Sequence, residues 1–182
     1  CYTEKKENGI MLFKMCKEEF EKVYEIIAEA FPTDERRTFD EERKLLSRPN
    51  FEILVWKEGG EGDVKGFISL YRLDDFCFAE HFAVSAKYRN EGIGQSVLRQ
   101  LLATEEQKIC LEVEPPVTEQ ARRRIGFYRR NGFFLNEYPY IQPSISKGSK
   151  PVPLLIMTSG APVGEAEFLK IKEALYRDVY GL

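Results

Sequence analysis

A strand that runs into a glycine turn and then into a helix constrains this chain most. The segment spans residues 82–102 and reads FAVSAKYRNEGIGQSVLRQLL. It opens with the apolar strand end Phe82–Val84, and apolar residues return at helical spacing from Ile93 onward. Gly92 and Gly94 carry no Cβ, so a ligand can approach the backbone closely. The first N–H groups of the helix lack internal partners and carry partial positive charge, so the segment predicts a phosphate or pyrophosphate site.

The glycine spacing excludes two other phosphate-binding motifs. The turn lacks a Gly-Lys-Ser/Thr ending, so it is not a P-loop, and its spacing is not that of the Rossmann G-x-G-x-x-G fingerprint. For a bare Gly-x-Gly, an ordinary glycine-punctuated helix start remains the alternative.

The composition is that of a folded protein without a membrane or nucleic-acid partner. Hydrophobic residues make up 43% and aromatic residues 13% of the 182 residues, so residues 1–182 are expected to form a single domain. A net charge of −3 argues against a general nucleic-acid binder. No apolar run approaches the roughly 20 residues of a membrane span, and no signal peptide is evident. The four cysteines form no C-x-x-C pair, so we expect reduced, mostly buried thiols in a cytoplasmic protein.

The hydrophobic periods predict a mixed α/β (α+β) fold, with a central sheet flanked by helices and a ligand site near the carboxyl ends of strands. A glycine-rich hairpin turn is expected at residues 58–63. The expected strands are 10–15, 51–57, 64–73, 76–84, 108–114, 133–140 and 152–158, and the expected helices are 17–31, 38–46, one from residue 93, 118–130 and 164–180.

Glu80 is the first candidate for proton transfer. The strand period of two places it among aromatic residues, where burial would raise the pKa of its carboxyl. A structural salt bridge with an arginine is the alternative. A bulge near residue 82 would change which of Glu80 and His81 faces the ligand. The period assigns Phe76, Phe78, Glu80 and Phe82 to one face, and Cys77, Ala79, His81 and Ala83 to the other.

His81 is the only histidine, which excludes a multi-histidine metal site, and we predict no metal. Its small neighbours favour a packed core histidine. On the next strand, Glu112 and Glu114 share a face with Cys110, and either carboxylate could line a site.

The turn Arg-x-x-Gly-x-Gly after a strand ending Ala-Val resembles the acetyl-coenzyme A loop of the GNAT N-acetyltransferase family, which reads Gln/Arg-x-x-Gly-x-Gly/Ala. A second motif, Tyr128 followed by Gly132 and Phe133, resembles the family's helix end Tyr-x-x-x-Gly-Phe. Two motifs at the expected separation are more specific than either alone. One departure is Ala121, where the family often has an asparagine that contacts the cofactor; Arg122 or Arg124 could substitute for it.

The resemblance implies a single GNAT-type domain with splayed central strands, and direct acetyl transfer from acetyl-CoA to an amine. Tyr128 would protonate the leaving thiolate, and the N–H of Val84 would stabilise the oxyanion. Glu80 is the expected base, with Glu112 second, and Cys77 is a less favoured acyl carrier because nothing obvious lowers its pKa. The expected cofactor-binding residues are Phe82, Ala83, Val84, Arg89, Asn90, Glu91, Gly92, Ile93, Gly94 and Gln95.

A third group of residues is expected to bind the acceptor amine. Glu35, Glu112 and Tyr140 are the expected substrate-binding residues, and the acidic residues Glu35, Glu80 and Glu112 would suit a cationic amine. Arg36 and Arg37 would suit an acceptor carboxylate, although solvated side chains are the favoured interpretation. Two other classes stay open: a non-catalytic acyl-CoA binding module, and a structural domain without a cofactor. Presence of both Glu80 and Tyr128 favours the enzyme, and the sequence leaves a homodimer open.

Overall fold

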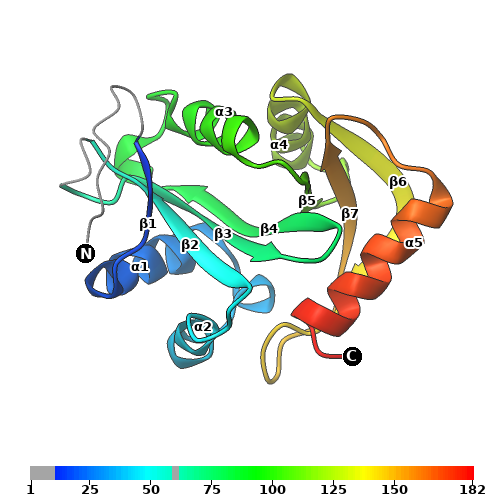
Figure 1. The fold of residues 1–182 in the computed structure, drawn as a ribbon, viewed down its shortest axis with the longest axis horizontal. Helices are drawn as coiled ribbons and strands as arrows, with labels where there is room; N and C mark the ends of the chain where they lie inside the picture. The colour runs from blue at the N-terminus through cyan, green and yellow to red at the C-terminus, as the bar shows by residue number, and fades with distance from the viewer. Residues whose placement is uncertain (1–10, 59–61) are drawn as a thin grey trace.

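A seven-stranded mixed sheet forms the centre of the protein in a computed structural model, which describes residues 11–58 and 62–182 (Figure 1). The spatial order of the strands is β1-β2-β3-β4-β5-β7-β6, and only the β4–β5 pair is parallel. The strands are β1 (Leu12–Lys14), β2 (Phe51–Trp56), β3 (Gly66–Arg72), β4 (Phe76–Val84), β5 (Lys108–Val113), β6 (Phe133–Gln142) and β7 (Val152–Ser159). The predicted α/β fold with a mostly antiparallel sheet is therefore confirmed.

Helices cover both faces of the sheet (Figure 1). Apolar side chains of α1, α2 and α5 pack in one core cluster, and those of α3 and α4 pack in a second cluster. The central strand β3 is buried along six of its seven residues because it is covered from both sides. The helices are α1 (Phe20–Ala30), α2 (Phe39–Leu45), α3 (Ile93–Thr104), α4 (Glu119–Arg130) and α5 (Glu165–Ala174).

Local sequence signals set the ends of the helices that border the site. Thr38 and Glu41 form a reciprocal capping box at the start of α2. The Thr118 hydroxyl accepts a hydrogen bond from the Ala121 N–H at 3.0 Å and so begins α4. Gly132, with φ +84°, follows the end of α4, as the Asn-Gly pair predicts. The hairpin turn expected at residues 58–63 falls partly outside the described residues.

The parallel pair β4–β5 opens along its length. Only Phe76–Ala79 pair with Lys108–Leu111, although β4 continues to Val84 and β5 continues to Val113. Beyond Ala79 the two strands therefore diverge, and the β5-facing backbone of β4 is left without a neighbouring strand. This is the splay that the family resemblance predicts.

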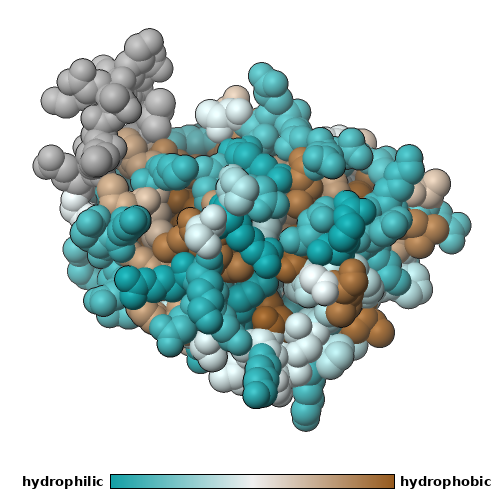
Figure 2. Space-filling view, turned by 60° about the horizontal axis from the view of Figure 1, so that its bottom comes forward, coloured by the Kyte–Doolittle hydropathy of each residue, from teal (hydrophilic) through white to brown (hydrophobic). Residues whose placement is uncertain are grey.

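Two further features bear on what the molecule can do. In the part of the chain that the structure describes, no helix is both long and apolar enough to cross a membrane. Hydrophilic residues dominate the face shown in Figure 2, and hydrophobic residues appear there as separate small areas between them. The cavity between the diverging strands β4 and β5 is the candidate functional site.

Candidate active site

A β-bulge re-aims the side chains of β4 just where the strands diverge. Two residues, Glu80 and His81, stand opposite the single residue Ser69 of β3. The Ser69 hydroxyl accepts a hydrogen bond from the His81 N–H at 3.0 Å. The sequence left open a bulge near residue 82, and the structure has one at residues 80–81. Because a bulge inserts one residue, the alternation of side chains reverses after it.

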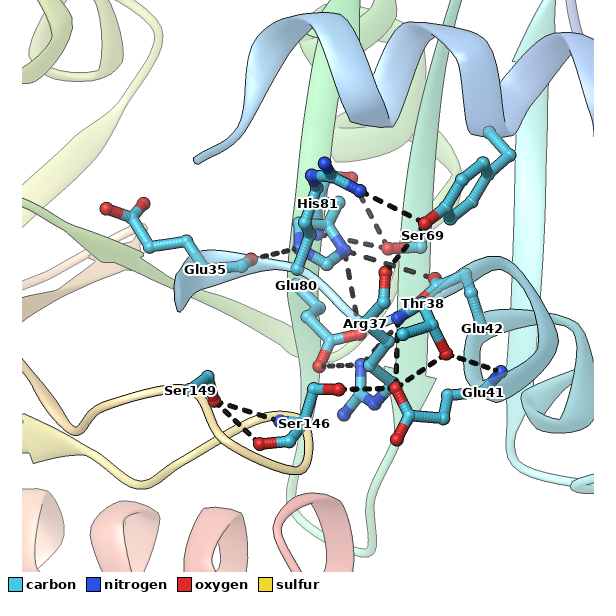
Figure 3. Close-up of polar contacts among 12 residues, drawn as sticks. Glu35, Arg37, Thr38, Glu41, Glu42, Ser69, Glu80, His81, Ser146 and Ser149 are labelled. Carbon is cyan, nitrogen blue, oxygen red and sulfur yellow. Dashed lines mark hydrogen bonds and ion pairs between the residues drawn. The ribbon is translucent and has the colours of Figure 1, made fainter. Parts of the chain in front are cut away.

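The reversal corrects one prediction. Phe82 was expected to share a face with Phe76 and Phe78. Instead, Phe82 packs in the core cluster that contains α3 and α4, while Phe76 and Phe78 pack in the cluster that contains α1, α2 and α5. The bulge instead lets Glu80 and His81 both reach the α1–α2 side of the sheet (Figure 3).

Glu80 is held in a buried ion pair. Its Oε1 accepts a hydrogen bond from Arg37 Nη1 at 2.8 Å, and its side chain is 2% exposed. The same Arg37 nitrogen lies 3.6 Å from Oε2 of Glu42, whose side chain is fully buried (Figure 3). Arg37 is therefore not solvated, contrary to the favoured expectation. The salt-bridge alternative for Glu80 describes what the structure shows.

His81 completes this buried cluster. Its Nε2 donates to the backbone carbonyl of Glu35 at 2.9 Å, which leaves Nδ1 3.8 Å from Glu80 Oε2 and 4.0 Å from Glu42 Oε1. The three side chains place ligand atoms within 4.8 Å of one another, as a metal site would. The guanidinium of Arg37 already supplies a positive charge beside both carboxylates, which disfavours a cation there. His81 is a buried core residue, as the sequence indicates.

A cavity of about 370 Å³ lies between the diverging strands. Ala79, Glu80 and residues 82–84 of β4 line one side, Leu111 and Glu112 of β5 line the other, and Tyr128 of α4 lies against it. A second cavity, of about 530 Å³, surrounds the glycine turn. The two cavities share Phe82, Ala83, Val84, Arg89, Arg124 and Tyr128 in their walls, so they form one continuous cleft.

The glycine turn has the geometry of an anion site. Asn90 and Gly92 both have left-handed backbone conformations, with φ of 69° and 77°. No side chain caps the helix at Gly92, and its carbonyl accepts the N–H of Ser96 at 3.1 Å. The N–H groups of residues 93–95 therefore precede the first helical hydrogen bond and are available to a ligand.

Most of the residues expected to bind the cofactor lie in the wall of this second cavity. Nine of the ten line it, and Glu91 is the exception. A Cβ at Gly94 would lie at ordinary van der Waals distance from Phe127 and Phe82, 3.4 and 3.6 Å away. The turn borders a cavity of about 530 Å³, so the side chains of the described residues do not fill it.

Tyr128 lies in the last turn of α4, at the junction of the two cavities. Its ring contacts those of Phe82, Phe127 and Phe133, with centroids 6.5, 5.4 and 5.7 Å away. Burial raises the pKa of its phenol to about 12, and the charge of Arg124 opposes the shift. The hydroxyl therefore stays protonated at neutral pH and can donate a proton or a hydrogen bond.

Glu112 faces the cleft from the opposite strand. Burial raises the pKa of its carboxyl to about 7, and hydrogen bonds from Tyr140 and Tyr180 work against that rise. The Tyr180 hydroxyl lies 2.9 Å from each carboxylate oxygen, and the Tyr140 hydroxyl donates to Oε1. Tyr140, expected to bind substrate, is 3% exposed, and its hydroxyl contacts the Glu112 carboxylate. Sequence patterns did not point to Tyr180, which is only one more residue of a terminal helix.

A small cavity of about 40 Å³ extends the cleft toward the segment after α1. Glu35, Glu112 and Glu114 line it, and Arg124 pairs with Glu114 at 2.8 Å. Burial, reinforced by the charge of Glu114, raises the pKa of Glu35. The excess of carboxylates makes this end of the cleft acidic.

The region around α2 and the loop before β7 contact each other near the cleft. The Lys150 N–H donates to Asp34 Oδ1 at 3.2 Å, and the Ser146 hydroxyl donates to Glu41 (Figure 3). Arg36 donates to the Phe31 carbonyl and to the Tyr24 hydroxyl, so it is engaged within the protein.

The surroundings of the remaining candidate residues show which of them can contact a ligand in the cleft. Burial raises the pKa of the Cys77 thiol to about 12, so Cys77 is a poor nucleophile. Ala121 is buried in the core face of α4. Arg122 turns away to the carbonyls of Pro116 and Val117, whereas Arg124 lines all three cavities. Arg124 is thus the arginine placed to contact a ligand in the cleft.

A sheet that opens along its one parallel pair beside an anion-binding turn is the architecture of an acyltransferase, and comparisons with known proteins support this class. The model of the acetyltransferase (GNAT) family matches residues 20–133. The chain belongs to this family, as the two sequence motifs predict.

Solved structures agree with the assignment. A protein from Bacteroides thetaiotaomicron, described as an acetyltransferase of the GNAT family, is 33% identical with a TM-score of 0.87, over 95% of this chain and 99% of its own. A spermidine N-acetyltransferase SpeG chimera from Vibrio cholerae is 12% identical with a TM-score of 0.60, over 88% and 99% of the two chains.

The ribosomal-protein-S18-alanine N-acetyltransferase of Escherichia coli is 17% identical with a TM-score of 0.57, and the match covers 85% of this chain and 96% of that protein's chain. The last two likenesses concern the fold alone. A comparison with curated protein sequences finds no match.

Proposed function

We propose that this acetyltransferase moves an acetyl group from acetyl-CoA directly to a primary amine of a small molecule or peptide. The observation that carries the proposal is the continuous cleft from the glycine turn, past Tyr128, to Glu112. A pyrophosphate on the turn and a pantetheine arm along the unpaired edge of β4 would place the thioester near Tyr128. The free, buried thiols of Cys77 and Cys110 support the expected cytoplasmic location.

The reaction needs one base and one acid. The base removes a proton from the acceptor's ammonium group, and the neutral amine then attacks the thioester carbonyl carbon. A backbone N–H of β4, that of Val84 by position, stabilises the resulting oxyanion. When the tetrahedral intermediate collapses, the C–S bond breaks and Tyr128 gives its proton to the coenzyme A thiolate, while the nitrogen of the new amide loses its second proton, which restores the Tyr128 phenol through solvent. The products are an amide and free coenzyme A.

Glu112 is the better base of the two carboxylates considered. Glu80 is already engaged by Arg37, whose Nη1 lies 2.8 Å from its Oε1, so this oxygen is occupied within the protein. Glu112 has a pKa of about 7, which is close to the operating pH that favours general base catalysis. Glu80 then becomes a residue that holds the bulge and the neighbouring segment in place.

The acceptor is a cationic amine. Glu35 and Glu112 line the inner end of the cleft, where Arg124 is the one lining arginine among the described residues and pairs with Glu114. Arg36 and Arg37 are engaged with Tyr24 and Glu80 within the protein. A positively charged amine would be attracted to this acidic end.

Replacement of Tyr128 by Phe tests the proposal. We expect kcat to fall by roughly 100-fold or more, because the leaving thiolate loses its proton donor, with unchanged affinity for acetyl-CoA. Thiol release over a panel of amines measures the first quantity, and calorimetric titration measures the second.

Tyr138→Phe is the matched control, since the Tyr138 hydroxyl contacts the Val163 carbonyl outside the cleft. Acetyl-CoA should also raise the melting temperature of the wild-type protein. Stabilisation by acetyl-CoA without turnover on any amine would favour a non-catalytic acyl-CoA binding module, and absence of both effects would contradict binding altogether.

A further inference from the structure

The last residues of the chain reach into the site through an unusual helical turn. After α5, residues Leu175–Val179 form a π-helical turn, in which the Tyr180 N–H donates to the Leu175 carbonyl at 3.1 Å. Such wide turns are rare and frequently occur at functional sites. Compared with a regular α-helix, one extra residue rotates the following side chain by about 100°.

This turn aims the Tyr180 phenol at Glu112. The hydroxyl lies 2.9 Å from both carboxylate oxygens, so its single O–H is shared between them. Tyr140 donates to Oε1 as well. A carboxylate has about four acceptor positions, so two phenols fix its orientation and still leave capacity for an incoming ammonium group.

We propose that Tyr180 is a positioning residue of the acetyltransferase site, which holds the Glu112 carboxylate toward the cleft and sets the pH range over which it accepts a proton. This inference rests on the proposed function, in which Glu112 is the base. Without the two phenols, burial alone would favour the protonated acid and Glu112 would be a poor base at neutral pH.

Other charged groups also face Glu112 and influence the pKa of its carboxyl, which the hydrogen bonds from the two phenols lower. Glu80 on β4 and Glu35 after α1 both disfavour its negative charge. Arg124 on α4 lines the same two cavities, but its guanidinium pairs with Glu114. Among the described residues, Tyr140 and Tyr180 make the hydrogen bonds that hold the Glu112 carboxylate.

Tyr180→Phe removes one oxygen atom and tests the inference. A hydrogen bond to a charged group contributes about 1.5–3 kcal/mol, so we expect the Glu112 titration midpoint to rise by about one pH unit or more. Carbon-13 NMR of labelled glutamate carboxyls measures the midpoint, and the signal that disappears in Glu112→Gln assigns it.

In the acetyl-transfer assay, the acid limb of the pH–rate profile should move upward by the same interval. The rate near pH 7 should fall roughly fivefold, while the rate near pH 9 should stay within about twofold of the wild type. Tyr176→Phe is the matched control, because the Tyr176 hydroxyl contacts the Ile141 carbonyl at 2.6 Å and not Glu112. It should leave the Glu112 midpoint unchanged.

The two readouts separate this inference from the proposed function. A Glu112 midpoint that is identical in Tyr180→Phe and the wild type would overturn the role of Tyr180, whether or not acetyl transfer occurs. Absence of transfer to any amine would refute the function, while the NMR titration still decides whether Tyr180 holds the carboxylate. If Tyr180→Phe fails to fold, Tyr140→Phe provides the same test on the other phenol.

Discussion

Two carboxylates of similar sequence context have different chemical states because their neighbours differ. Glu80 and Glu112 both lie within central strands and both line the cleft. A guanidinium, which is always charged, faces Glu80, whereas neutral phenols face Glu112. The phenols compensate the burial of Glu112 only in part, so its pKa is raised to about 7 and it can change protonation near neutral pH.

This difference predicts a pH-dependent stability. The pKa of Glu112 is about 7 in the fold, against an ordinary 4.5, so between these values the folded protein binds more protons than the unfolded chain. The free energy of unfolding should therefore fall as pH rises from 4.5 to 7, and then level off. At 1.36 kcal/mol per pH unit, the Glu112 contribution is about 3 kcal/mol.

Urea unfolding at pH 5 and pH 8 measures the effect. Glu112→Gln cannot titrate, so its free energy of unfolding should fall by about 3 kcal/mol less than that of the wild type over this interval. The exposed Glu137 gives the control, and Glu137→Gln should behave as the wild type does. Equal pH dependence in Glu112→Gln and wild type would show that Glu112 does not titrate in this range.

At the scale of single elements, the site is made from two local irregularities of one strand–turn–helix unit. The bulge at Glu80 and His81 reverses the side-chain alternation of β4, so that Phe82 lies against Phe127 on α4. The left-handed turn at Asn90 and Gly92 then leaves the first amides of α3 open. The bulge positions the wall of the cleft, and the turn forms its anion-binding end.

Gly92→Ala tests the turn. A left-handed backbone costs an alanine about 1–2 kcal/mol, so the variant should be destabilised by about this amount, or its turn should relax. If the turn relaxes, binding must restore the strained form, and coenzyme A affinity should fall roughly tenfold. Urea unfolding and calorimetric titration with coenzyme A measure the two effects.

Gly126→Ala is the matched control within α4. A Cβ there would meet only the end of the flexible Arg130 side chain, at 3.3 Å. Helix propensity should make this variant more stable by up to about 1 kcal/mol, with coenzyme A affinity unchanged. Wild-type affinity in Gly92→Ala would argue against the turn as the pyrophosphate site.

At the scale of the molecule, a buried charge cluster joins the α1–α2 connection to the middle of the sheet. Arg37 comes from the segment before α2, Glu42 from α2, and Glu80 and His81 from β4 (Figure 3). Both oxygens of Glu42 are buried without a hydrogen-bond partner, and burial raises the pKa of this carboxyl, while Arg37 Nη1 lies 3.6 Å from its Oε2. The cluster anchors the α1–α2 connection on the sheet.

Arg37→Met should therefore destabilise the whole domain. Removal of one partner from a buried ion pair typically costs about 3–5 kcal/mol, because the opposite charge is left uncompensated. The measurement is the free energy of unfolding in urea. Arg43→Met, at an exposed position in the same helix region, should change it by no more than about 0.5 kcal/mol. A similarly small change in Arg37→Met would mean that the cluster does not anchor the fold.

Much of the fold could be predicted because its signals are short-range. The period-two pattern predicted β4 with the bounds observed, Phe76–Val84, and the Asn-Gly pair predicted the end of α4. The glycine turn was recognisable because it depends on a few adjacent residues. The partners of the candidate carboxylates could not be recognised in the sequence. A charged residue has many available partners, and periodicity does not choose among them.

Local residue patterns were thus sufficient to predict the order of elements, to locate the glycine turn and Tyr128, and to indicate membership of the GNAT family. The folded arrangement alone decided the partners of the two candidate carboxylates. Arg37 lies 43 residues from Glu80, and Tyr180 lies 68 residues from Glu112, so both contacts form only when distant segments pack together. The pKa of a buried group depends on these contacts and on its distance from water, which are properties of the packed molecule.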